Sequence, residues 1–227
     1  MDTLLRLGGG KARRRSRTAI LLALVVMTAA AATTPRELVK NTAQALVEAL
    51  RAHRAELAGD PALAHRLADQ TVVPHIDFPR IARWVAGRYW RSATAHQRRQ
   101  FTEVFRQFLI NTYVSAMVNY ADRILAHADS VSFPPVAGEA HPGEATVRMA
   151  IRLEQGRQVA VDYRLHRRDG QWLIEDVSID GISLVLTYRQ SLSSQFARQG
   201  MDGVIRSLRE HNAGQGGKSG GRPPPSH

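Results

Sequence analysis

The chain has 227 residues, with 31 Lys and Arg against 20 Asp and Glu, a net charge of +11 and no cysteine. The lack of cysteine excludes disulfides and thiolate-based zinc or iron–sulfur sites. The basic residues form no stripe with interleaved aromatic residues and match no known binding motif, so nucleic acid is not expected as a partner.

Residues 1–32 have the three parts of a secretory signal peptide. Six basic residues lie among the first eighteen, an apolar run covers 19–27, and small residues follow up to Ala32. This order is typical of an exported protein. The alternative, an uncleaved N-terminal anchor, is less favoured because a membrane span needs about 20 apolar residues. We therefore expect a periplasmic protein; without residues 1–32 it has 25 Lys and Arg against 19 Asp and Glu, a net charge of only +6.

Four helices are predicted before residue 128. The first spans about 34–58, the second about 60–73, and a short third helix begins at Asp77. The fourth, about 94–124, has the clearest apolar face in the sequence. Its apolar residues recur at helical spacing: Phe101, Val104, Phe105, Phe108, Leu109, Tyr113, Met117, Tyr120 and Ile124.

After residue 128 the apolar period changes from helical to alternating. Runs near 131–136, 146–153, 159–166 and 171–179 alternate apolar and polar residues, with Gly-containing turn signals between the later ones. Alternation with short turns is typical of an antiparallel meander with one apolar face.

Two further helices are predicted after the strands. Asp180 is expected to cap a helix from Ile182, which Gly200 interrupts before a last helix to about Arg209. Residues 211–227 are rich in Gly, Pro and Ser and are predicted to be disordered. The sequence thus predicts one α+β domain over 33–210, in which about six helices enclose a twisted antiparallel sheet of about four strands.

The sequence contains no recognisable catalytic constellation. Its histidines do not have the HExxH spacing, and neither a Gly-x-Ser-x-Gly motif nor a glycine-rich phosphate loop is present. Asp176 and Asp180 could form a carboxylate pair, but their places at a strand end and a helix start favour turn and capping roles. We expect no catalytic residue, no metal site and no cofactor.

The helices and the sheet turn many large apolar residues toward one another. Stripes at these spacings usually fill a core, and the pattern alone favours that interpretation. The alternative is a sheet that curves under the helices and leaves an apolar cavity open at one end, which would suit a lipid.

Three stretches resemble the MlaC family, also called the toluene-tolerance family, of periplasmic phospholipid carriers. They are residues 73–90, which include Trp84 and Trp90, the helical stretch 97–113, and residues 172–203, which end in Gly-Met-Asp-Gly. They follow one another at the family's spacing, and the resemblance covers roughly residues 35–210.

The resemblance implies a sheet like the nuclear-transport-factor cone, with an apolar cavity that encloses the acyl chains of a phospholipid. It also implies a monomeric carrier that shuttles lipid between an outer-membrane lipoprotein–porin assembly and an inner-membrane ABC transporter with its lipid-binding ring subunit. A tight strand-to-helix junction is expected at 181–183, close to the cavity. The predicted lining residues are Ile76, Phe78, Ile81, Val85, Phe105, Leu109, Tyr113, Val147, Met149, Ile151, Val161, Tyr163 and Val177.

Two other functions stay open on the sequence alone. A small hydrolase or isomerase on a cone-shaped scaffold would need Asp162 or His166 to face the cavity, whereas the alternation places both on the polar side of the sheet. An interaction module of the cell envelope would have a filled core and a functional surface.

Overall fold

The structure, a computed structural model, describes residues 33–57, 59–136 and 141–215. The predicted signal peptide and most of the predicted C-terminal tail lie outside these residues. Within the described ranges, none of the helices combines the length and the hydropathy needed to cross a membrane.

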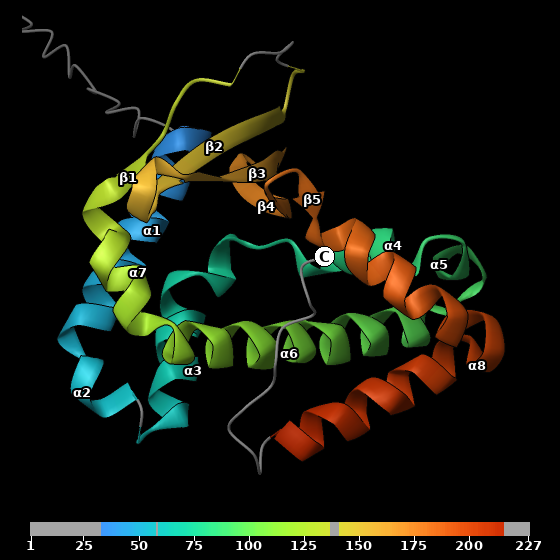
Figure 1. Ribbon diagram of the computed structural model, residues 1–227. Helices are drawn as coiled ribbons and strands as arrows, with labels where there is room; N and C mark the ends of the chain where they lie inside the picture. The colour runs from blue at the N-terminus through green and yellow to red at the C-terminus, as the bar shows by residue number, and fades with distance from the viewer. Residues whose placement is uncertain (1–32, 58, 137–140, 216–227) are drawn as a thin grey trace, which may run out of the picture. The chain divides into compact units, whose positions relative to one another are not determined.

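Helices form the first half of the described chain (Figure 1). Two of these helices begin with a capping box, as predicted. Thr34 pairs with Glu37 in one, and Thr94 pairs with Gln97 in the other. The long predicted helix ends at Asn119, and a separate short helix follows. The bounds are α1 Pro35–Ala52, α2 Arg54–Leu57, α3 Pro61–Thr71, α4 Phe78–Ala86, α5 Arg88–Ser92, α6 Ala95–Asn119 and α7 Ala121–His127.

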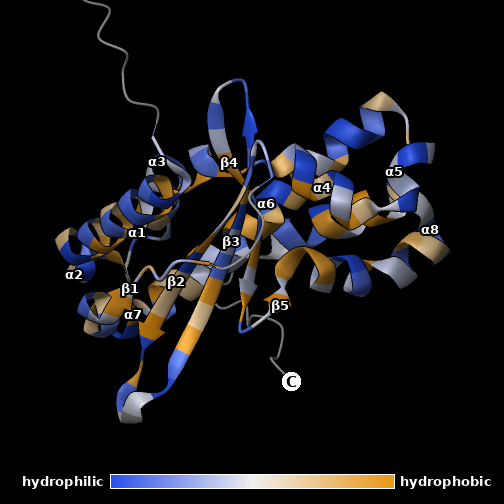
Figure 2. Ribbon diagram, turned by 90° about the horizontal axis from the view of Figure 1, so that it is seen from above, coloured by the Kyte–Doolittle hydropathy of each residue, from blue (hydrophilic) through white to orange (hydrophobic). Residues whose placement is uncertain are grey.

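The sheet is an antiparallel meander with strand order β1-β2-β3-β4-β5. Along β2 and β3, apolar and polar residues follow each other, so one face is apolar (Figure 2). The strands are β1 Val131–Ser132, β2 Glu144–Arg152, β3 Gln158–Arg168, β4 Gln171–Ile179 and β5 Ile182–Ser183. The α+β class is confirmed, with one strand more than the four expected.

The additional strand, β5, lies where the sequence predicted the start of a helix. Asp180 and Gly181 both have positive φ, 48° and 83°, which suits the two central positions of a tight hairpin. Asp180 therefore does not cap the following helix, and its carboxylate accepts the N–H of Ala160 instead. The helix α8, Leu184–Gln215, is capped by Ser183 and by Asp176, which accept the N–H groups of Leu186 and Val185.

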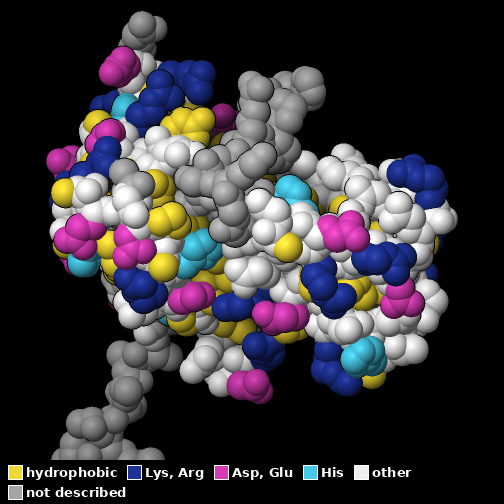
Figure 3. All heavy atoms as spheres, turned by 90° about the horizontal axis from the view of Figure 1, so that it is seen from below, with side chains coloured by type: hydrophobic (Ala, Val, Ile, Leu, Met, Phe, Trp, Pro, Cys, Tyr) yellow, Lys and Arg dark blue, Asp and Glu magenta, His cyan; other side chains and the backbone are white. Residues whose placement is uncertain are grey.

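The helices pack on one another as well as on the sheet. In Figure 1, α6 runs beneath the sheet. α8 packs against α6, and α4 contacts both of these helices. Phe101, Phe105, Tyr188 and Phe196 form the aromatic centre of the core that joins α6 to α8. Where helix surfaces face outward, basic and acidic side chains are interspersed with hydrophobic ones (Figure 3).

The last helix extends further than predicted. The sequence predicts disorder from residue 211 onward, whereas residues 211–215 belong to α8. The side-chain amide of Asn212 donates a hydrogen bond to the carbonyl oxygen of Val104 at 3.0 Å. This contact joins the last turns of α8 to α6, which the Gly-rich composition could not indicate.

Gly200 divides α8 into two arms, in agreement with the predicted break. Its φ of 64° and ψ of −170° lie in a region that is essentially restricted to glycine. A Cβ at this position would meet no atom within 4 Å, so any cost of a side chain comes from the backbone conformation.

We expect Gly200→Ala to lower the free energy of unfolding by about 1–3 kcal/mol, the usual cost of such a conformation for a residue with a Cβ. Urea denaturation followed by circular dichroism measures this change. Gly214→Ala is the control, because a Cβ at this helical position also meets nothing within 4 Å. The control should be neutral or slightly stabilising; equal losses at both positions would contradict the proposed strain.

Candidate functional site

A cavity of about 530 Å³ lies between the apolar face of the sheet and the helices. Its walls come from α3, α4, α6 and the start of α8 on one side, and from β2, β3 and β4 on the other. Tyr120 at the end of α6 and Ile179 at the end of β4 line it and are 46% and 43% exposed. The cavity wall therefore reaches solvent at both of these residues.

The cavity wall is almost entirely apolar. Its polar atoms belong to four tyrosines and Asp176. The Asp176 carboxylate is already occupied, because it accepts hydrogen bonds from the Ser183 hydroxyl at 2.6 Å and from the Val185 N–H at 3.2 Å. The hydroxyls of Tyr113 and Tyr188 lie 3.4 Å apart and bond to each other. No convergent acid–base pair is left among the described lining residues.

Burial disfavours the charged form of three tyrosines in this wall. Loss of hydration raises the pKa of Tyr163 to about 12 and raises the pKa of Tyr113 and of Tyr188 as well. These side chains thus act as neutral, mostly apolar surfaces at any ordinary pH.

Nine of the thirteen predicted lining residues lie in this cavity wall. They are Ile76, Phe78, Ile81, Leu109, Tyr113, Met149, Val161, Tyr163 and Val177. That they contact a lipid stays a prediction.

The other four predicted residues do not line this cavity. Val85 and Phe105 belong to the core between α4, α6 and α8, because α8 covers that part of the helices. Val147 packs with Val39 of α1 and is also core. Ile151 lines a second, adjoining cavity of about 780 Å³.

The prediction missed several residues that line the cavity. Some continue the stripe of α6 that the sequence had already revealed, namely Met117, Tyr120 and Ile124. Others had no distinguishing signal, because their role depends on which helix faces them. These are Leu46, Ala68, Val72, Val73, Ile110, Val114, Ala116, Ile174, Asp176, Ile179, Leu184, Val185 and Tyr188.

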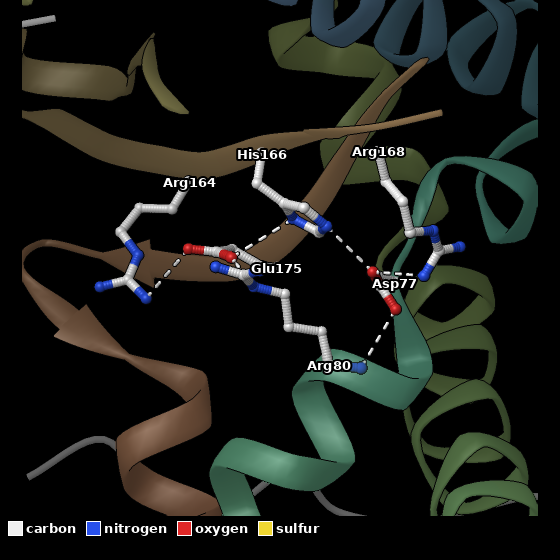
Figure 4. A network of polar contacts seen from close by, with 6 residues as sticks. All are labelled: Asp77, Arg80, Arg164, His166, Arg168 and Glu175. Atoms are coloured by element: carbon white, nitrogen blue, oxygen red, sulfur yellow. Dashed lines mark hydrogen bonds and ion pairs between the residues drawn. The ribbon is translucent and has the colours of Figure 1, made fainter. Parts of the chain in front are cut away.

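A buried ionic network fixes the start of α4 to β3 and β4 (Figure 4). His166 lies between two buried carboxylates: its Nε2 is 3.0 Å from Asp77 and its Nδ1 is 3.3 Å from Glu175. Arg168 pairs with Asp77 at 2.7 Å, while Arg80 and Arg164 pair with Glu175.

His166 is thus on the polar side of the sheet, as the alternation predicted, but it is not solvated. Only 6% of it is exposed, because Asp77 and the first turn of α4 cover it. A bulge near Glu175, where the pairing of β3 with β4 shifts, brings this carboxylate to the same side. Neither His166 nor Asp162 lines the cavity, which removes the residues that an enzyme would have needed there.

The network positions one wall of the cavity. Asp77 lies between Ile76 and Phe78, which both line it, and its N–H donates to the carbonyl oxygen of Ile174 at 2.9 Å. Its carboxylate also accepts the N–H of Arg80 and so caps α4. Movement of α4 away from the sheet would have to break these contacts together.

We expect Asp77→Ala to lower the free energy of unfolding by about 3–5 kcal/mol, because it leaves the buried side chain of His166 without its carboxylate partner and removes the cap of α4. Urea denaturation measures the loss. Asp69→Ala is the matched control: Asp69 contacts Arg106 at 3.3 Å but is half exposed, so its loss should be about 1 kcal/mol or less. Similar losses for both variants would contradict a structural role of the network.

The chain is similar in sequence to proteins of one known family. The sequence pattern of the family described as "MlaC protein" matches residues 40–210. The toluene tolerance protein ttg2D of Pseudomonas putida is 25% identical over 171 residues, which cover 74% of this chain and 76% of that protein. The intermembrane phospholipid transport system binding protein MlaC of Haemophilus influenzae is 22% identical over 184 residues, covering 78% and 82%.

A solved structure has a similar fold. It is the phospholipid-binding protein from Ralstonia solanacearum in complex with a phospholipid. The two structures align with a TM-score of 0.68 and 27% sequence identity, over 80% of this chain and 98% of the other.

Proposed function

Because the chain belongs to the MlaC family, we propose that it is a phospholipid carrier whose cavity encloses acyl chains. The observation that carries this proposal is the open, almost wholly apolar cavity of about 530 Å³ between the sheet and the helices. The phospholipid bound to the similar protein of Ralstonia solanacearum supports the same assignment.

The wall has the chemistry that hydrocarbon chains require. Each CH₂ group removed from water contributes about 0.8 kcal/mol, and no directional partner is needed. The nine cavity-lining residues predicted from the sequence are therefore assigned to contact with the acyl chains. Because binding is spread over many uncharged side chains, the sequence contains no ligand-binding motif.

The protein acts by transfer and not by catalysis. The hydrophobic contribution of the buried chains makes spontaneous release slow, so a partner must favour an open state of the carrier. We assign the two partners to an inner-membrane ABC transporter with its lipid-binding ring subunit and an outer-membrane lipoprotein–porin assembly. The carrier between them is a monomer.

Lipid transfer between an inner and an outer membrane requires that the carrier lie in the compartment between them. Residues 1–32, which have the pattern of a signal peptide, would direct the chain to the periplasm. The carrier domain then begins at residue 33 and includes α8 up to Gln215.

The test is to purify the full chain gently from the periplasm, extract it with solvent and identify lipids by mass spectrometry. A carrier yields phospholipid in a stoichiometric amount. A folded protein that carries none, and takes none from vesicles, would contradict the proposal and favour an interaction module.

A variant that fills the cavity should reduce lipid binding without unfolding the protein. Ala116 lines the cavity, and we expect Ala116→Phe to displace several CH₂ groups of the cargo. Loss of three would cost about 2.4 kcal/mol, which is more than a tenfold loss of affinity. Native mass spectrometry after incubation with vesicles measures the lipid-bound fraction.

Ala126→Phe is the control for this substitution, since Ala126 is exposed on α7. It adds the same side chain outside the cavity and should leave the lipid-bound fraction unchanged. If Ala116→Phe binds as much lipid as this control, the acyl chains do not occupy the cavity.

A further inference from the structure

The second cavity, of about 780 Å³, adjoins the first one and differs from it in character. It lies between α1, α7 and the strands β1 to β3. Six apolar or aromatic residues line both cavities and form the boundary between them: Leu46, Val72, Ile124, Met149, Tyr163 and Ile174. Flexible side chains such as Met149 make this boundary adaptable.

The wall of the second cavity has a net positive charge. Arg123 of α7 and Arg157, at the turn between β2 and β3, both line it. Glu154 is the one carboxylate among the described residues of its wall. The acidic residues next to Arg123 in the fold, Asp122 and Asp129, are already paired with other arginines.

Arg123 and Arg157 thus lack an ion-pair partner within the described part of the chain. Two guanidinium groups in this wall give it an excess of positive charge over Glu154. Guanidinium groups bind phosphate through paired hydrogen bonds, which makes arginine the preferred side chain for this anion.

Two hydroxyl groups in the same wall also lack a partner. Thr42 Oγ1 is buried and has no hydrogen-bond partner within the described residues. The hydroxyl of Tyr163, at the boundary of the two cavities, also has no hydrogen-bond partner among those residues. The unpaired hydroxyl of Tyr163 is therefore suited to bond with a polar group of a ligand.

We propose that Arg123 and Arg157 in the wall of the second cavity bind the phosphate of the phospholipid, and that the protein prefers lipids of net negative charge, because the same two guanidinium groups repel a cationic headgroup such as choline. This inference rests on the proposed function. Arg123 lies about one helical turn after Tyr120, which stands at the mouth of the first cavity. Acyl chains in the first cavity would leave their phosphate within reach of Arg123.

In the test, the full chain is incubated with mixed vesicles. The vesicles contain equal amounts of phosphatidylglycerol and phosphatidylcholine with identical acyl chains. The bound lipids are then extracted and their ratio is measured by mass spectrometry. Two partly exposed arginines should favour phosphatidylglycerol by about threefold to tenfold. In the double variant Arg123→Glu, Arg157→Glu the ratio should fall to about one or below.

Arg198→Glu is the matched control, because Arg198 is exposed on α8 and lines neither cavity. It changes the charge in the same way and should keep the wild-type ratio. Arg157→Gln, a neutral change in an exposed turn, is the second variant in case the double variant does not fold, and it should lower the ratio by about half or more.

The outcomes separate this inference from the proposed function. Wild-type protein that binds both lipids at a ratio near one overturns the headgroup site but leaves the carrier intact. The same holds if Arg198→Glu lowers the ratio as much as the double variant does, since the effect would then be one of overall charge. Wild-type protein that takes up neither lipid overturns the carrier function itself.

Discussion

Asp77 joins the helical layer to the sheet through its backbone and its side chain. Its N–H bonds to Ile174 of β4, while its carboxylate caps α4 and pairs with His166 and Arg168 of β3. The adjacent residues on both sides belong to the cavity wall. Apolar walls tend to close on each other, because protein interiors are close-packed. An open cavity therefore needs contacts that hold its walls in position. The buried network therefore holds the part of the wall that Ile76, Phe78 and Ile174 form.

Much of the fold follows from patterns within single elements. The capping boxes at Thr34 and Thr94 and the alternation along β2 and β3 require only local physics, and they were predictable. β5 and the burial of His166 were not, because each depends on a distant partner. The backbone at Asp180 is set by its bond to Ala160, and His166 is covered by a helix about ninety residues earlier in the chain.

The same distinction divides the candidate site. α6 has one apolar stripe, yet its first half is core and its second half is cavity wall. Phe101 and Phe105 pack against α8, whereas Leu109, Tyr113 and Met117 face the space under the sheet. The apolar period is the same in both halves, so the stripe alone does not separate core from cavity wall, although the second half, residues 107–119, differs in having no charged residue. What separates them is the course of α8, which covers only part of the stripe.

The neutral tyrosines of the wall have a consequence for how cargo is chosen. A cavity without free charges measures hydrocarbon by area, since every added CH₂ contributes a similar increment until the space is full. Such a wall is therefore sensitive to how much of a chain it can enclose. The size of the cavity thus limits the length of chain that the carrier can enclose. A lipid with longer chains would leave part of each chain in water.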